Sequence, residues 1–223
     1  MATYMEYAEI AHQVYHTDFT ELPPEQISRW LQVNNFALRE MRKGSRFDPQ
    51  GYGVQFGKYE SGLEVIVAFC GTNTENDWGK GWSDLVNDLD IGLGLIPNQI
   101  FPAVEYTRAV ASLLTANQRL SLTGHSLGGA LAQLVGANQG LPFVTFGAPG
   151  SKHLLPLITA NPPASAVNFT AWGDMVTWVG QAHVGQVISM TKGGAWTFPT
   201  THYMPNYKTL LAREGWASRR FMF

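Results

Sequence analysis

Two hydrophobic patterns alternate along the chain. Apolar side chains at helical spacing predict helices over residues 4–14, 25–40, 102–116 and 206–214. A run rich in Ala, Leu and Gly predicts a further helix from Ser126 to about residue 138. Short, largely apolar runs bounded by Gly, Pro or polar residues predict strands at residues 51–58, 64–69, 120–122, 142–146, 166–172 and 186–190. From residue 64 to residue 146 the predicted order is therefore strand, helix, strand, helix, strand.

This alternation predicts the fold class. Strands that are joined through helices form right-handed crossovers. We therefore expect an α/β fold with a mostly parallel central sheet flanked by helices. The run at 65–69 is apolar throughout, as expected for a central strand that is covered on both faces. No repeat, linker or low-complexity segment interrupts the pattern, so we expect residues 1–223 to form a single domain. In such a sheet, functional side chains gather at the carboxyl ends of the strands.

Composition and charge narrow the function classes. Hydrophobic residues make up 45% of the 223 residues and charged residues 14%, which excludes a disordered, solvated chain. The net charge of −2 provides no electrostatic basis for binding nucleic acid. The single cysteine, Cys70, excludes an intrachain disulfide. No signal peptide or membrane-spanning run is evident, so we expect a cytoplasmic enzyme or one exported by a specialised secretion system.

A glycine-flanked serine lies at the junction of a predicted strand and a predicted helix. Gly124, Ser126 and Gly128 form the G-x-S-x-G pattern of a nucleophile elbow, in the strand–turn–helix context that this motif requires. The turn is so tight that side chains at the two glycine positions would collide with neighbouring backbone. The helix after Ser126 points its N-terminus at the same place, where backbone N–H groups stabilise an oxyanion. The alternative is an ordinary glycine turn in an α/β protein.

The predicted strand at 64–69 ends in Cys70-Gly71-Thr72. In α/β-hydrolases, the other half of the oxyanion hole lies at the end of a central strand upstream of the elbow. We therefore favour Thr72 as an oxyanion-hole residue over a plain strand-ending turn.

An acid and a base are needed to activate a serine hydroxyl, and in this fold the chain order is serine, acid, histidine. Asp174 is the only aspartate after the elbow, and it follows the predicted strand at 166–172. His153 precedes Asp174 and breaks the order. His202 follows the last predicted strand, where the base usually lies, and we favour it over His183, which leads into that strand.

These residues together resemble the class 3 lipases, which are fungal lipase-like α/β-hydrolases, and especially a small bacterial branch of lipases and phospholipases. The resemblance implies Ser126 as nucleophile, Asp174 as acid and His202 as base, with the backbone N–H groups of Thr72 and Leu127 as oxyanion donors. It covers roughly residues 54–207, and its matching segments are residues 68–72, 77–78, 84–85, 122–132, 145–149, 168–176, 183–185, His202 and Tyr207.

The chain departs from the family pattern before the Gly71-Thr72 pair. The family usually has an arginine there, and this chain has Cys70. This departure should alter the support of the oxyanion loop more than the donor itself.

The implied function is hydrolysis of carboxylic esters of lipids through an acyl-enzyme, by a lipase or phospholipase A1, with a short-chain esterase also open. We expect no cofactor and no metal. Two other classes stay open: a non-catalytic lipid-binding protein on the same fold, and an acyltransferase that uses the same acyl-enzyme.

Features that bear on the substrate are less specific. The glycine-rich apolar segment at 91–97 fits a flap over the pocket and a buried crossover equally well. Trp172, Trp178 and Trp196 suggest an acyl site or contact with a lipid interface, although large aromatics are more often core residues. The residues at 219–221 fit contact with an anionic membrane or a solvated tail, and we favour the tail.

Overall fold

The computed structural model describes residues 1–16, 32–33, 36–43, 55–71, 99–163, 165–180, 182–191 and 200–223. Its strands are β1 Gln32–Val33, β2 Phe36–Lys43, β3 Gln55–Ser61, β4 Glu64–Phe69, β5 Arg119–His125, β6 Phe143–Phe146, β7 Ala166–Ala171 and β8 Gln186–Met190. Its α-helices are α1 Tyr4–His16, a helix over residues 99–112, α4 Leu127–Gln139 and α5 Met204–Arg213. Short 3₁₀ helices are η2 Lys152–Leu157, η3 Met175–Trp178 and η4 Thr200–His202.

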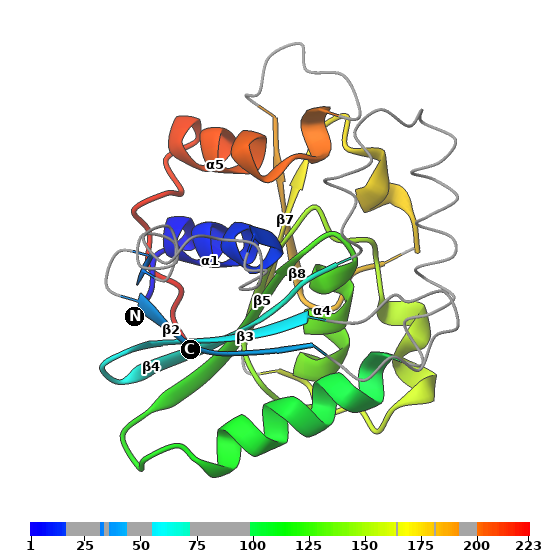
Figure 1. The fold of residues 1–223 in the computed structure, drawn as a ribbon. Helices are drawn as coiled ribbons and strands as arrows, with labels where there is room; N and C mark the ends of the chain where they lie inside the picture. Colours follow the sequence, from blue (N-terminus) through cyan, green and yellow to red (C-terminus); the bar gives the residue numbers. More distant parts are fainter. Residues whose placement is uncertain are drawn as a thin grey trace.

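The strands form one sheet in sequence order from β1 to β8 (Figure 1). Strands β4 to β8 are parallel, and β1 to β4 extend the sheet by antiparallel pairing. This confirms the α/β fold with a mostly parallel sheet flanked by helices. The helix at 99–112 and α4 pack in the same core on one face of the sheet (Figure 1), as expected when right-handed crossovers lead each time to the neighbouring strand. The opposite face is covered by α1 and α5, which come from the two ends of the chain.

The helix predicted over residues 25–40 is wrong over its second half. Strands β1 and β2 occupy that stretch, and β2 pairs with β3 from Ala37↔Glu60 to Lys43↔Gln55. Residues 25–31 lie outside the described part. The reason is tertiary: β3 has a second backbone edge whose N–H and C=O groups need partners, and this requirement outweighs the helical spacing of a few apolar residues.

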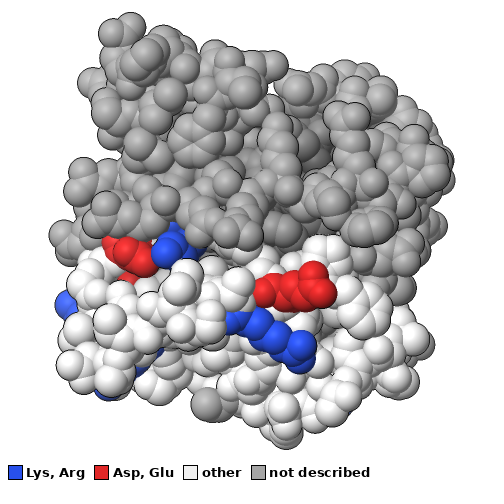
Figure 2. Space-filling view, turned by 60° about the horizontal axis from the view of Figure 1, so that its bottom comes forward, with Lys and Arg blue, Asp and Glu red and all other residues white. Residues whose placement is uncertain are grey.

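The surface charge is sparse, as the composition suggests. Figure 2 shows one face of the molecule, on which most described side chains are uncharged and the few basic and acidic side chains lie near one another. On that face, the described residues form no broad patch of one sign. The described part of this face therefore shows no concentration of one sign of charge that would favour a highly charged partner.

Two hydrophobic cores lie on opposite faces of the sheet, and alternate residues of β4 enter one or the other. Val65, Val67 and Phe69 pack with α4 and the helix at 99–112. Ile66 and Ala68 pack with α1 and α5. All five side chains are fully buried. The continuous apolar run thus follows from a strand with both faces covered.

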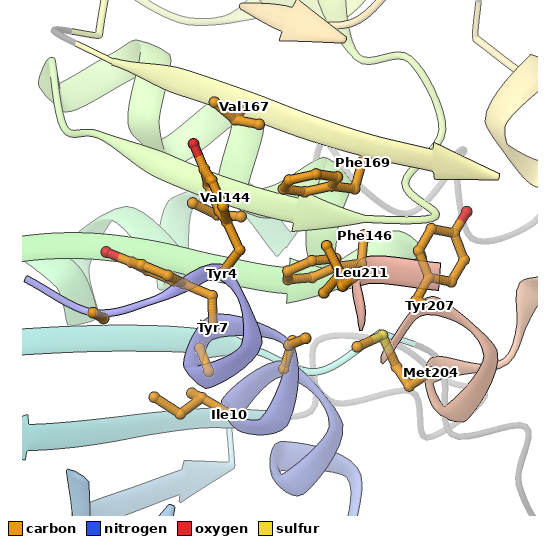
Figure 3. Close-up of a cluster of buried hydrophobic side chains, with 14 of the residues drawn as sticks. Tyr4, Tyr7, Ile10, Val144, Phe146, Val167, Phe169, Met204, Tyr207 and Leu211 are labelled. Atoms are coloured by element: carbon orange, nitrogen blue, oxygen red, sulfur yellow. The ribbon is translucent and has the colours of Figure 1, made fainter. Parts of the chain in front are cut away.

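The core under α1 and α5 is built on aromatic rings (Figure 3). The rings of Phe146 and Phe169, on neighbouring strands, stack with centroids 5.6 Å apart and planes inclined by 8°. Tyr4 of α1 meets Phe169 edge-on at 4.9 Å. Phe221, near the chain end, is buried between Tyr4 and Tyr7, so this part of the expected solvated tail is instead a core residue.

Replacing Phe169 with alanine should lower the free energy of unfolding by about 3–5 kcal/mol, because the substitution removes a fully buried ring and leaves a cavity. Urea denaturation measures this loss. Phe101→Ala is the control, since that ring is 67% exposed and its loss should change stability by about 0.5 kcal/mol or less. Equal losses in the two variants would contradict the assignment of Phe169 to the core.

Candidate active site

Ser126 occupies the turn between β5 and α4, in a backbone conformation that is rare for residues with a side chain. Its φ is 55° and its ψ is −130°, and among the described residues it is the only non-glycine with positive φ. Such a conformation costs about 1–3 kcal/mol and persists only where the surroundings enforce it. The strain holds the serine at the tip of the turn.

The two flanking glycines are required by the close approach of three backbone segments. A Cβ on Gly128 would overlap the carbonyl oxygen of Phe69, at the end of β4. A Cβ on Gly124 would overlap the backbone of Gly128. The pattern G-x-S-x-G is therefore a packing requirement that β4, β5 and α4 impose together.

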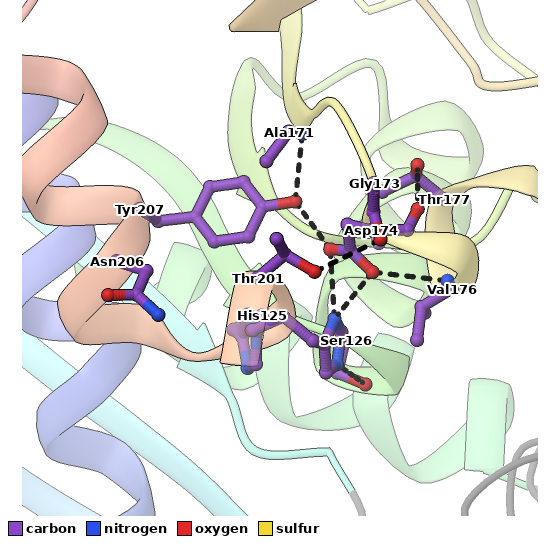
Figure 4. Close-up of polar contacts among 12 residues, drawn as sticks. His125, Ser126, Ala171, Gly173, Asp174, Val176, Thr177, Thr201, Asn206 and Tyr207 are labelled. Carbon is purple, nitrogen blue, oxygen red and sulfur yellow. Dashed lines mark hydrogen bonds and ion pairs between the residues drawn. The ribbon is translucent and has the colours of Figure 1, made fainter. Parts of the chain in front are cut away.

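Ser126 and Asp174 lie close to each other (Figure 4), and the ring of His202 hydrogen-bonds to both side chains. Its Nε2 is 3.0 Å from Ser126 Oγ, and its Nδ1 is 3.0 Å and 3.1 Å from the two carboxylate oxygens of Asp174. An ionised carboxylate only accepts hydrogen bonds, so Nδ1 carries the proton of a neutral ring. Nε2 is then the acceptor that faces the serine hydroxyl.

Asp174 follows β7 and is fully buried. Besides His202, its carboxylate accepts hydrogen bonds from the Val176 N–H at 3.1 Å and from the Tyr207 hydroxyl at 2.6 Å. The Tyr207 hydroxyl in turn accepts from the N–H of Ala171. Burial, followed by the nearby negative charge of Asp174, raises the pKa of Tyr207 well above its ordinary value, so this tyrosine stays a neutral donor.

The sequence pattern gives no indication of the contact between Tyr207 and Asp174. Tyr207 stands in one of the segments that carry the family resemblance, but its position in the predicted C-terminal helix indicates no partner. Only the folding of α5 over the end of β7 brings it to the carboxylate.

The elbow histidine, His125, packs against His202. The two rings have centroids 4.5 Å apart, and His125 Nε2 lies 2.7 Å from the backbone oxygen of His202. A carbonyl oxygen only accepts, so Nε2 carries the proton and donates it. Burial, with a smaller contribution from His202, lowers the pKa of His125 well below its ordinary value. This histidine is therefore neutral at physiological pH.

The other two candidates for the base, His183 and His153, hydrogen-bond to main-chain oxygens and not to Ser126 or Asp174. His183 donates from Nε2 to Ala148 O at 2.8 Å, and burial lowers its pKa. His153 donates from Nδ1 to Gly180 O at 2.9 Å and is exposed. Among the histidines of the described residues, it is His202 that bonds to both Ser126 and Asp174.

The oxyanion region is described in part. Leu127 is the first residue of α4, where backbone N–H groups have no acceptor within the helix. Gly71 lies against it: a Cβ there would be 3.2 Å from Leu127 N and 3.0 Å from Gly128 N. The structure thus brings the end of β4 to the N-terminus of α4. Thr72, the other expected donor, lies outside the described residues.

Comparison with known proteins identifies the family. Residues 6–202, most of the chain, match a phospholipase-like family described as the Tle-like phospholipase domain. The chain belongs to this family. An extracellular phospholipase A1 of Serratia liquefaciens is 31% identical over 128 residues, which cover 55% of this chain and 36% of the relative. The chain thus spans about a third of that protein's length.

Solved lipase structures share the fold of this Tle-like domain. Lipase II from Rhizopus niveus matches with a TM-score of 0.50 and 17% identity, over 84% of this chain and 79% of the lipase. The N225Q mutant of MDLA from Penicillium cyclopium matches with a TM-score of 0.51 and 18% identity, over 89% of this chain and 83% of that one. The resemblance to class 3 lipases is thereby confirmed at the level of fold.

Two exposed aromatics of the Tle-like domain flank the candidate acid. Trp172, directly after β7, is 78% exposed, and Trp178, at the end of η3, is 67% exposed. Neither is a core residue. Trp196 and the segment at 91–97, for which we weighed a flap and a crossover, lie outside the described residues.

The described residues contain no feature typical of a metal site or a membrane span. Within the ranges given above, no group of three His, Cys, Asp or Glu side chains is arranged to hold a metal ion. None of the helices in the same ranges is both long and apolar enough to cross a membrane.

The buried, neutral His125 should make the fold less stable in mild acid. An unfolded histidine takes up a proton near pH 6.5, whereas folded His125 does so only well below that value, so the unfolded state binds more protons and stability falls with pH. Between pH 7 and pH 5 this one group should lower the free energy of unfolding by about 2 kcal/mol.

Urea denaturation at pH 7, 6 and 5 measures this dependence. The matched variant is His125→Gln, whose side-chain amide keeps a donor where Nε2 lies and does not titrate. It should lose about 2 kcal/mol less than the parent over this range. Parallel pH profiles for the two proteins would contradict a neutral, buried His125.

Proposed function

We propose that the protein hydrolyses carboxylic esters of lipids, with Ser126 as nucleophile, His202 as general base and Asp174 as the acid that orients it. The observation that carries this proposal is the hydrogen-bonded chain from Ser126 Oγ through both ring nitrogens of His202 to Asp174. A serine hydroxyl is a weak nucleophile until a base accepts its proton. Membership of a phospholipase family supports lipids as the substrate class.

In the first half of the reaction, Ser126 Oγ attacks the ester carbonyl carbon while His202 Nε2 takes its proton. The imidazolium that forms faces the buried carboxylate of Asp174, which stabilises the charge and keeps Nδ1 protonated. The tetrahedral intermediate carries its negative charge on the former carbonyl oxygen. His202 then protonates the departing alcohol, and the acyl group stays on Ser126.

The oxyanion needs preorganised donors beside Ser126. The backbone N–H of Leu127 is one candidate, because the first turn of α4 points its N–H groups out of the helix. The second is the N–H of Thr72, one residue beyond Gly71. Each such donor is worth about 3 kcal/mol of transition-state stabilisation.

In the second half, water replaces the alcohol. His202 removes a proton from the water, the hydroxide attacks the acyl-enzyme, and the fatty acid leaves as Ser126 recovers its proton. We infer a lipase or phospholipase A1, in line with the name of the Serratia relative.

We also propose that residues 1–223 form one domain. The continuous sheet from β1 to β8 supports this proposal.

Replacing Ser126 with alanine should abolish ester hydrolysis, with a loss of at least about 10⁴-fold in kcat, because no nucleophile remains. The assays are p-nitrophenyl butyrate hydrolysis and mass spectrometry of phospholipid and acylglycerol products. A fluorophosphonate probe should label the parent protein at Ser126. Ser112→Ala is the matched control, since that hydroxyl is exposed and donates to Ala109 O.

The same experiments separate the alternatives. Equal turnover by Ser126→Ala would contradict the assigned nucleophile. A parent protein that neither reacts with the probe nor releases fatty acid would be a lipid-binding protein on a hydrolase fold. Transfer of the acyl group to an added alcohol in excess of hydrolysis would make it an acyltransferase.

We also propose that the edge of the sheet formed by the carboxyl ends of the parallel strands, where Asp174 lies, contacts a lipid surface. Trp172 and Trp178 stand exposed on either side of this residue, and an indole ring has the apolar body and polar N–H that suit a membrane interface. Contact at this edge would bring the ester bond to the carboxyl ends of the strands, where Ser126 lies.

The double variant Trp172→Ala/Trp178→Ala should bind phosphatidylcholine vesicles about tenfold more weakly, because partial burial of two indoles is worth about 1–3 kcal/mol. Vesicle sedimentation measures this, and hydrolysis of p-nitrophenyl butyrate should stay unchanged. Leu63→Ala/Leu113→Ala is the control, since these exposed leucines precede β4 and β5 at the opposite edge. Equal weakening in both double variants would contradict the proposed contact edge.

A further inference from the structure

Tyr15, near the end of α1, places its hydroxyl between two strand ends of the candidate site. The hydroxyl accepts a hydrogen bond from the backbone N–H of Gly71 at 3.1 Å. It donates to the backbone oxygen of His125 at 2.9 Å. Gly71 follows β4, and His125 is the last residue of β5. One side chain from the N-terminal helix thus joins the candidate oxyanion segment to the strand that carries the nucleophile.

This link stands where the pairing of the two strands ends. The register of β4 with β5 runs from Glu64↔Arg119 to Phe69↔Gly124. Beyond Phe69 the two strands diverge, because β5 turns at Ser126 into α4. The Tyr15 hydroxyl links the two strand ends where main-chain pairing stops, since it accepts from Gly71 N–H and donates to the backbone oxygen of His125.

Gly71 lies directly against the N-terminus of α4. A Cβ on Gly71 would lie 3.2 Å from Leu127 N, so its backbone runs directly beside the proposed oxyanion donor. Thr72, the proposed second donor, is the next residue along the chain. Oxyanion stabilisation requires donors that are held in place before the reaction, and a small displacement of either one weakens it.

We propose that Tyr15 is a positioning residue for the oxyanion hole, which it holds in register with the nucleophile elbow through its hydroxyl. The inference rests on the proposed ester-hydrolase function. The ring supports the same role, since it meets the ring of His125 edge-on at 5.8 Å, and His125 binds the backbone of His202. Tyr15 acts on the donors through Gly71 and touches no reacting atom.

Tyr15→Phe removes this hydroxyl and keeps the ring. A lost donor costs about 10²–10³ in kcat, so a displaced one should cost roughly tenfold. KM for p-nitrophenyl butyrate should stay within about twofold, because the acyl and alcohol contacts are unchanged. Inactivation by a fluorophosphonate should slow by a similar factor, since the phosphoryl oxygen of the probe occupies the same hole.

Tyr7→Phe is the matched control. Tyr7 lies on the same helix, and its hydroxyl also hydrogen-bonds to β5, at 2.8 Å from Ser121 Oγ. Ser121 lies in the middle of that strand, away from the strand end that carries the site. Tyr7→Phe should lower the unfolding temperature by about as much as Tyr15→Phe does, because each variant loses one buried hydroxyl hydrogen bond to β5, and it should keep the parent kcat.

Amide hydrogen exchange at residue 71 supplies a readout that does not depend on activity. The exchange rate of the Gly71 N–H should rise in Tyr15→Phe and stay at the parent level in Tyr7→Phe, because only the first variant removes its acceptor. Thermal unfolding of both variants checks that they are folded.

The outcomes separate this inference from the function on which it rests. Parent kcat in Tyr15→Phe, unchanged exchange at Gly71, or an equal loss of kcat in Tyr7→Phe would each overturn the positioning role. An inactive parent protein with unlabelled Ser126 would overturn the ester-hydrolase proposal, whereas faster exchange in Tyr15→Phe would still show that the hydroxyl holds Gly71.

Discussion

The close approach of three backbone segments at the nucleophile elbow is the constraint on which the rest of the site depends. The end of β4, the turn after β5 and the first turn of α4 come so near one another that Gly124 and Gly128 cannot carry side chains. This packing holds Ser126 at positive φ and directs its hydroxyl toward His202. It also sets the N-terminus of α4 beside the end of β4. One packing arrangement therefore places both the serine and the donors that we assign to the oxyanion.

A second constraint comes from the buried charge of Asp174. A carboxylate without exposed surface is tolerated only when donors surround it, and here these come from His202, Val176 and Tyr207. The donors belong to η4, η3 and α5, so the charge ties three segments to the end of β7. The polar chain that we propose for catalysis thus also holds together the segments that carry it.

The N-terminal helix is part of the same assembly. It packs with α5 on one face of the sheet, so the two ends of the chain cover a common aromatic core. Two of its tyrosines, Tyr7 and Tyr15, reach β5 through their hydroxyls, and the second reaches the strand end that bears the elbow. A helix that carries none of the expected catalytic residues is in this way connected to the site geometry.

The sequence by itself determined the parallel sheet and the elbow motif. These features are local, since apolar runs, helical spacing and the glycines around Ser126 each reflect neighbours close in the chain. It also supported Asp174 and His202 by chain order, although it left His183 as the alternative. Tertiary structure decided what depends on distant partners: strand β2 in place of a helix, the hydrogen bond of Tyr207 to Asp174, and the Tyr15 hydroxyl between β4 and β5. Such contacts join residues up to about a hundred positions apart, and no local pattern encodes them because their energy exists only once the sheet has formed.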